Sequence, residues 1–97
     1  MKKILLAEDE EHILDAIKLN LELEGFFVSA CKNGTEAVLL AKKQVFDLVI
    51  LDVMLPGTNG FEACRQIKQG NAATPVLFLT ALSDSQNRIK GLKLADD

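Results

Sequence analysis

The sequence is poor in residues that form covalent or metal-bound frameworks. It contains two cysteines and one histidine, and it has neither tryptophan nor tyrosine. Cys31 and Cys64 stand alone, without a CxxC pair, so the sequence indicates neither a zinc site nor a disulfide framework. We expect two reduced thiols that pack as small apolar side chains.

Long apolar runs and clustered basic residues are also missing. No run approaches the roughly 20 apolar residues that cross a bilayer. The start Met1-Lys2-Lys3 leads into only four apolar residues, which are too few for a secretory signal. The net charge is -3 and the basic residues are scattered, whereas phosphate contacts need clustered Lys and Arg. We therefore expect a cytoplasmic protein that contacts neither a membrane nor nucleic acid through this segment.

What remains is the composition of one globular domain. The chain has 97 residues, of which 48% are hydrophobic and 26% are charged. Three short apolar runs lie at residues 4–7, 48–51 and 76–79. They do not alternate with polar residues, which is typical of parallel strands buried on both faces. Residues 26–31 alternate more, which predicts a strand nearer the edge of the sheet.

Helical spacing separates the predicted strands. Ile13, Leu14, Ile17 and Leu21 recur at three- and four-residue intervals, which predicts a helix over about residues 11–24. A second helix over residues 35–43 is predicted to be capped by Asn33. Gly60 opens a predicted third helix that ends near residues 70–71.

The end of the sequence predicts a fourth helix and an uncovered strand. Ser83 or Asp84 would cap that helix, which would carry Ile89 and Leu92. The alternation of strands and helices predicts an α/β doubly wound parallel sheet with helices on both faces. Residues 76–79 would then form an apolar edge unless another strand covered it, and such edges favour self-association. We therefore expect the domain, residues 1–97, to be incomplete at its carboxyl end.

Carboxylates follow two of the buried strands. Asp52 ends the run at 48–51, while Glu8 and Asp9 follow the run at 4–7. A single acid at the end of a strand is usually a solvated loop residue. Ligands of parallel sheets bind outside the carboxyl ends of the strands, so we expect Asp9 and Asp52 to converge there. Neighbouring carboxylates repel unless they share a cation, and oxygen ligands suit Mg²⁺.

A metal-bound carboxylate can attack a phosphoryl group and form an acyl phosphate. Asp52 is the better candidate nucleophile, because the loop after it leaves the Met54 carbonyl available to the same ion. Glu8 could position a metal-bound water. Thr80 follows the run at 76–79, where its hydroxyl could reach a transferred phosphoryl oxygen, although a helix or turn cap is an alternative role for it.

Four segments carry a resemblance to a known family: residues 3–10 (KILLAEDE), 47–57 (DLVILDVMLPG), 59–62 (NGFE) and 75–81 (PVLFLTA). In order and spacing, over all 97 residues, the chain resembles the receiver domain of two-component response regulators (CheY-like superfamily). The resemblance implies the flavodoxin-like strand order 2-1-3-4. It also implies phosphorylation of Asp52 by the phosphohistidine of a sensor histidine kinase, and a switching hydroxyl on Thr80. Mg²⁺ would be held by Asp9, Asp52 and the Met54 carbonyl, with Glu8 acting through water.

Other implications concern activity and output. Receiver domains take part in their own phosphoryl transfer and dephosphorylation rather than acting as conventional enzymes. The sequence of residues 53–57 (VMLPG) resembles that of family members that regulate transcription. In the family the chain normally continues into a fifth strand, a Lys-Pro pair and a last helix, and this sequence has none of them. The family lysine pairs with phosphoryl oxygens. Lys90 and Lys93 fall in the predicted fourth helix and are poor replacements for that lysine, so we expect phosphoryl transfer by this chain alone to be impaired.

Alternative functions differ in what the acids would do. A flavodoxin-like cofactor module would need a phosphate loop rich in Ser, Thr and Gly where residues 8–11 read EDEE. A haloacid-dehalogenase-like phosphatase normally has a second Asp where Met54 stands. No GxxxxGK[ST] phosphate loop occurs. An interaction module of receiver shape that is not phosphorylated remains an open alternative.

Overall fold

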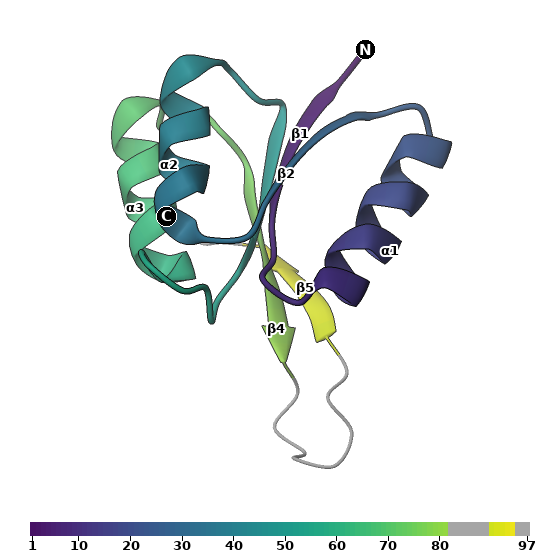
Figure 1. Cartoon of the computed structure of the whole chain (residues 1–97). Coiled ribbons are helices and arrows are strands. Elements are labelled where there is room, and N and C mark those ends of the chain that lie inside the picture. The colour runs from purple at the N-terminus through teal and green to yellow at the C-terminus, as the bar shows by residue number, and fades with distance from the viewer. Residues whose placement is uncertain (82–89, 95–97) are drawn as a thin grey trace.

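A five-stranded sheet forms the centre of the molecule in this computed structural model (Figure 1). The structure describes residues 1–81 and 90–94, with the side chains described up to residue 79. The strand order is β2-β1-β3-β4-β5. The strands are β1 (Lys3–Ala7), β2 (Phe27–Cys31), β3 (Leu48–Asp52), β4 (Val76–Ala81) and β5 (Lys90–Leu94).

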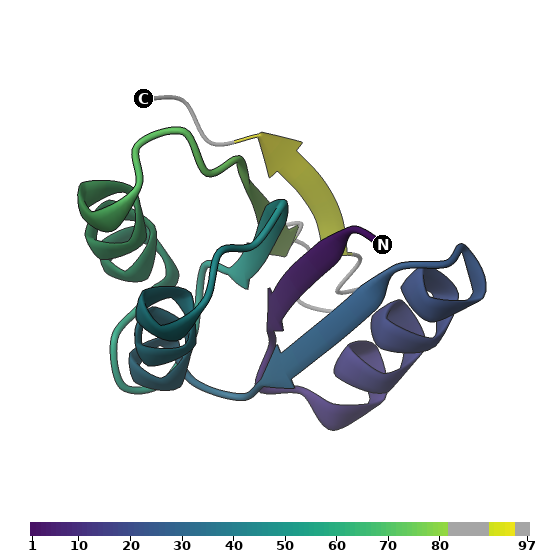
Figure 2. The ribbon, with the colours of Figure 1, turned by 90° about the horizontal axis from the view of Figure 1, so that it is seen from above.

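Three helices cover the sheet from both sides. They are α1 (Glu11–Leu23), α2 (Gly34–Lys43) and α3 (Gly60–Gly70). α1 lies on one face of the sheet, whereas α2 and α3 lie side by side on the other (Figures 1 and 2). Strands β1 to β4 are parallel. The predicted doubly wound fold, the order 2-1-3-4 and all three of these helices are therefore confirmed.

The last described strand corrects the sequence-based expectation for the carboxyl end. Residues 90–94, which include Lys90, Leu92 and Lys93, form β5 and pair antiparallel with β4. The predicted fourth helix is wrong for this stretch, because the open hydrogen-bonding edge of β4 outweighs a short helical spacing. Gly91, a poor helix former, and the alternating Leu92 and Leu94 fit a strand. The proposed caps Ser83 and Asp84, and Ile89, lie outside the described residues.

The same pairing removes the basis for one expectation about association. β5 covers the edge of β4 along its length, from Leu77 opposite Leu94 to Ala81 opposite Lys90. A fifth parallel strand, which the family resemblance implies, does not occur in the described residues. The expectation that the fourth strand is uncovered is therefore wrong, and with it goes the reason for expecting self-association through that edge.

Alternate residues of each central strand enter opposite cores. Leu5 and Val49 pack beneath α2 and α3, whereas Ile4, Leu6 and Ile50 pack beneath α1. All five side chains are almost completely buried. Two-sided burial explains why the runs in β1 and β3 are continuously apolar. Because the strands are covered on both faces, charged side chains occur only where the apolar runs end, as they do at the carboxyl ends of β1 and β3.

Both cysteines are buried thiols, as the sequence predicts. Burial, with the charge of Glu36 as a lesser cause, raises the pKa of Cys31 to about 11. The reactive thiolate of Cys31 is therefore scarce at neutral pH. No helix in the described part of the chain is long and apolar enough to cross a membrane.

The cap of α2 provides a first prediction. The Asn33 side-chain oxygen accepts a hydrogen bond of 2.7 Å from the Glu36 amide, as expected of a helix N-cap. Asn33→Ala should lower the free energy of unfolding by about 1 kcal/mol, measured by urea denaturation followed by circular dichroism. Asn33→Ser, which keeps an acceptor, should retain most of that stability. Equal losses in both variants would contradict a role for the cap.

Candidate functional site

The sheet register places two buried carboxylates side by side. Ala7 of β1 pairs with Leu51 of β3, so Glu8 and Asp52 are the next residues on neighbouring strands. Glu8 is 0% exposed and Asp52 is 2% exposed, although both are charged residue types. Asp9, the next residue along, is exposed. Asp9 and Asp52 therefore meet at the carboxyl edge of the sheet, as predicted, with Glu8 buried beside them.

Backbone amides hold the two buried carboxylates in place. The Glu10 amide donates a hydrogen bond of 2.7 Å to Oε2 of Glu8, and the Met54 amide donates one of 3.2 Å to Oδ1 of Asp52. Hydrogen bonds to an ionised acceptor are stronger than those between neutral groups. Each carboxylate is thus oriented by the chain that leaves its own strand.

Three acids form one compact group of oxygen donors. One carboxylate oxygen from each of Glu8, Asp9 and Asp52 lies within 4.8 Å of the other two. Such a group concentrates negative charge in a partly buried place, and the repulsion falls when a cation is shared. An all-oxygen donor set suits a hard ion such as Mg²⁺, which keeps some of its waters. The residues present therefore fit a divalent hard cation.

Met54 and Thr80 reach this edge of the sheet by different routes. The Met54 side chain is 76% exposed, while its amide faces Asp52. Leu79 pairs with Asp52, so the next residue of β4, Thr80, follows at the same edge. Its backbone is opposite Gly91 of β5, and its side chain lies outside the described part of the structure.

Gly60 allows α3 to begin directly against the end of β3. Its amide donates to the Val53 carbonyl at 3.0 Å, which closes the loop between the strand and the helix. A Cβ atom at residue 60 would lie 2.2 Å from the backbone oxygen of Asp52. The sequence identified Gly60 only as the start of a helix. It also gave no capping role to Asn59, whose side chain caps α3 by accepting from the Glu62 amide at 2.9 Å.

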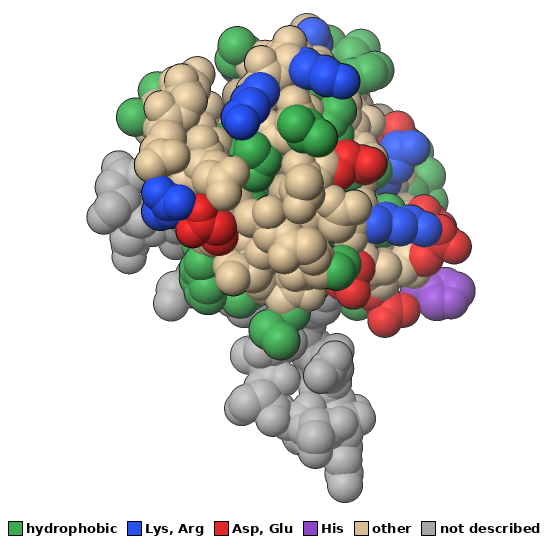
Figure 3. Space-filling model, turned by 60° about the vertical axis from the view of Figure 1, so that its left-hand side comes forward, with side chains coloured by type: hydrophobic (Ala, Val, Ile, Leu, Met, Phe, Trp, Pro, Cys, Tyr) green, Lys and Arg blue, Asp and Glu red, His purple; other side chains and the backbone are tan. Residues whose placement is uncertain are grey.

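An ion pair lies beside the acidic group, at the start of α1. Lys32, just after β2, donates to Glu11 in the first turn of α1. The hydrogen bond from Lys32 holds the pKa of Glu11 below its ordinary value, and Glu11 raises the pKa of Lys32. Both side chains are exposed, so the pair contributes little to stability. In Figure 3, acidic side chains gather toward the lower right, while basic ones lie at the upper end and also beside acidic ones at the left and right.

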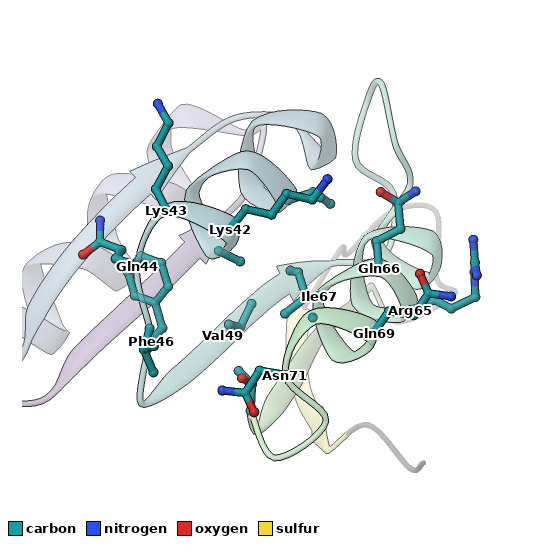
Figure 4. A pocket seen from close by; sticks show the side chains of 15 residues that line it. Lys42, Lys43, Gln44, Phe46, Val49, Arg65, Gln66, Ile67, Gln69 and Asn71 are labelled. Carbon is teal, nitrogen blue, oxygen red and sulfur yellow. The ribbon is translucent and has the colours of Figure 1, made fainter.

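A groove of about 710 Å³ lies at the opposite edge of the sheet, between the last turns of α2 and α3. Phe46, Val49 and Ile67 form its floor, while Lys42 and Arg65 stand at its rim (Figure 4). No acid of the Glu8, Asp9 and Asp52 group lines it. Arg65 already pairs with Glu62. The acidic site is therefore the better candidate for chemistry.

Comparison with known proteins decides the family. The model of the response regulator receiver domain matches residues 4–96. The chain belongs to this family. Among solved structures, the receiver domain resembles the response regulator TrrA from Thermotoga maritima in complex with Mg²⁺-BeF, at a TM-score of 0.81 and 36% identity, covering 86% of this chain and 72% of that one. A structure of TrrA in complex with the histidine kinase ThkA gives a TM-score of 0.78, at 34% identity over 92% of this chain and 77% of that one.

Curated relatives are longer than the receiver domain itself. This chain is 39% identical to the transcriptional regulatory protein ResD of Bacillus subtilis over 95 residues, covering 98% of this chain and 39% of ResD. It is 45% identical to the transcriptional regulatory protein CreB of Escherichia coli over 94 residues, covering 97% of this chain and 41% of CreB. The chain thus spans about two fifths of the length of these relatives.

Proposed function

We propose that Asp52 is the phosphoacceptor of a two-component signalling pathway and that its modification depends on Mg²⁺. The observation that carries the proposal is the group of Glu8, Asp9 and Asp52, with oxygens within 4.8 Å of one another at the carboxyl edge of the sheet. Membership of the receiver family supports the assignment of the reaction. The alternatives of a cofactor module and a phosphatase have no comparable support.

The proposed metal ligands are those that the donor chemistry favours. Asp9, Asp52 and the Met54 carbonyl would hold Mg²⁺, with Glu8 acting through a water molecule. The bound ion would neutralise the charge of the carboxylates and of the transferred group. Asp52 is the residue best placed to react, because it ends β3 and because the Met54 amide orients its carboxylate.

The proposed reaction moves one phosphoryl group between two side chains. A carboxylate oxygen of Asp52 forms a bond to phosphorus while the phosphorus–nitrogen bond of the donor phosphohistidine breaks. The imidazole nitrogen keeps that electron pair. When the signal ends, water attacks phosphorus and the bond between phosphorus and Asp52 breaks, which releases inorganic phosphate and restores the carboxylate. The hydroxyl of Thr80 would donate to a phosphoryl oxygen and report the modified state to the surface.

We further propose a sensor histidine kinase as the donor and transcription as the regulated output. The complex of the similar protein TrrA with ThkA supports a kinase partner. ResD and CreB, both transcriptional regulatory proteins, support the output. A regulator of transcription in a bacterial cell would act in the cytoplasm. Neither role needs this domain to contact DNA itself, which agrees with its acidic charge.

The direct test is phosphorylation by a small acyl phosphate. In the presence of Mg²⁺, the chain should gain the mass of one phosphoryl group, in a form stable to acid and labile to base. Asp52→Asn should abolish the gain, because an amide is not a nucleophile at this position. Mass spectrometry of the intact protein measures both results.

The matched control is Asp47→Asn, which makes the same chemical change at the other end of the same strand. Asp47 precedes β3 and accepts a hydrogen bond of 2.7 Å from the Lys3 amide. The Asp47→Asn variant should be phosphorylated on Asp52 to the same extent as the parent chain. Adduct formation that survives in Asp52→Asn would exclude Asp52 as the acceptor. A parent chain without any adduct, under conditions that modify another receiver, would favour the interaction module instead.

A further inference from the structure

The loop that follows Asp52 is bound at its tip by a helix that is distant in sequence. Residues 53–59 connect β3 to α3 and pass below α2 and α3 (Figure 1). The Gly34 amide, in the first turn of α2, donates to the Pro56 carbonyl at 3.1 Å. The Thr58 amide donates to Oγ1 of Thr35 at 3.3 Å. The two threonine hydroxyls lie 3.0 Å apart, so a further hydrogen bond joins them.

Two glycines make this approach sterically possible. A Cβ atom at Gly34 would lie 1.6 Å from the Thr58 carbonyl oxygen, a distance that no side chain can occupy. Gly57 has φ +72°, in the left-handed region that favours glycine. A Cβ atom at Gly57 would lie 3.0 Å from Oγ1 of Thr35. The backbone of the tip is therefore in direct contact with the backbone of α2.

The tip is close enough to the acidic site to influence it. Only three residues separate Asp52 from Pro56, and Met54 is one of them. The Met54 amide orients Asp52, and its carbonyl is a proposed ligand of Mg²⁺. Leu55 is 6% exposed and anchors the middle of the loop in the core. With the strand end, Leu55 and Pro56 all fixed, Met54 has little conformational freedom left.

We propose that Thr35 and Thr58, with Gly34, clamp this loop onto α2 and thereby position the Met54 backbone and the Asp52 carboxylate for Mg²⁺ binding. These are positioning residues, since none of them belongs to the acidic group. The inference rests on the proposed function of that group. Preorganisation of the loop raises metal affinity, because a site that is ordered before binding loses less entropy when the ion arrives.

The test compares Mg²⁺ affinity by calorimetry in variants that loosen the clamp to different extents. Thr35→Val removes the acceptor for the Thr58 amide and the hydroxyl pair, and should weaken Mg²⁺ binding by about five-fold. Thr35→Ser keeps both contacts and should bind within about two-fold of the parent chain. Gly34→Ala should weaken binding by ten-fold or more, about 1.4 kcal/mol or above, because the tip must leave α2.

A second readout follows the loop without the metal. Hydrogen exchange of the Met54 amide should become about five-fold faster in Thr35→Val than in the parent chain. Thr74→Val is the matched control. Thr74 is 7% exposed and lies at the amino edge of the sheet, just before β4, so its loss should change neither Mg²⁺ affinity nor exchange at Met54. Circular dichroism establishes that each variant is folded.

The outcomes separate the clamp from the proposed function. Folded Thr35→Val and Gly34→Ala chains that bind Mg²⁺ as the parent does, with unchanged exchange at Met54, would overturn the clamp. If Gly34→Ala does not fold, Thr35→Val and its serine counterpart decide the matter alone. A parent chain that binds Mg²⁺ and takes no phosphoryl group would instead overturn the proposed function, and the affinities would still decide the clamp.

Discussion

Gly60→Ala should destabilise the domain by about 3 kcal/mol. The new Cβ atom would lie 2.2 Å from the Asp52 carbonyl oxygen and 2.8 Å from the Cα atom of Val53. Both are backbone atoms at the end of a central strand, so they cannot move aside as a flexible side chain would. The first turn of α3 must shift away from β3 instead. A loss of this size is a large part of the roughly 5 to 15 kcal/mol that stabilises a typical domain.

Gly70→Ala is the control for this prediction, because it makes the same change at the other end of the same helix. A Cβ atom there would have no neighbour within 4 Å. Its effect should stay within about 0.5 kcal/mol. Urea denaturation followed by far-ultraviolet circular dichroism measures both, since the chain has no tryptophan or tyrosine to serve as a fluorescent probe. Similar stabilities for the two variants would show that α3 can move at no cost.

The second large effect concerns the charge of the acidic group. Mg²⁺ at ten times its dissociation constant should raise the free energy of unfolding by about 1.4 kcal/mol, and at one hundred times by about 2.7 kcal/mol. In chelator, Asp52→Asn should be more stable than the parent chain by about 1 to 2 kcal/mol. The amide removes one of three mutually repelling charges and can still accept from the Met54 amide. The same variant should lose most of the response to Mg²⁺.

Asp52→Asn should raise the free energy of unfolding in chelator but reduce the stabilisation that Mg²⁺ adds, and this combination distinguishes a lost metal site from damaged packing. A substitution that merely damages packing would lower stability with and without the metal. Asp47→Asn, at the exposed amino end of β3, should respond to Mg²⁺ like the parent chain. Denaturation curves of the parent chain, Asp52→Asn and Asp47→Asn, each in chelator and in Mg²⁺, give the six free energies of unfolding that are compared. Equal stability of the parent chain in both solutions would show that Glu8, Asp9 and Asp52 do not form a binding site for the ion.

The sequence predicted the parts of this site that depend on local signals. Strand ends are marked by the change from apolar to charged residues, and parallel strands bring such ends to one edge of a sheet. For that reason the positions of Glu8, Asp9 and Asp52 followed from the runs before them. The helix cap at Asn33 is likewise a signal carried by residues next to one another.

The features that escaped prediction depend on contacts between distant parts of the chain. Nothing near Gly34 in sequence indicates that the Thr58 carbonyl will lie against it, and nothing near Gly60 reports its distance from Asp52. The conformation of residues 90–94 likewise depends on a distant segment, because they form a strand by pairing with the edge of β4. Local propensity is outweighed wherever a backbone edge or a close approach fixes the conformation.

The two buried thiols give this domain a pair of internal probes. Cys31 lies in β2, an edge strand of the sheet, and Cys64 lies in α3, on the side of the helix that is buried in the core. A disulfide reagent can reach either one only when the surrounding layer opens. The labelling rates at the two positions therefore report separately how often the edge strand and the α3 layer open. Because the two thiols are native, the opening of each layer can be followed without introducing a foreign label site.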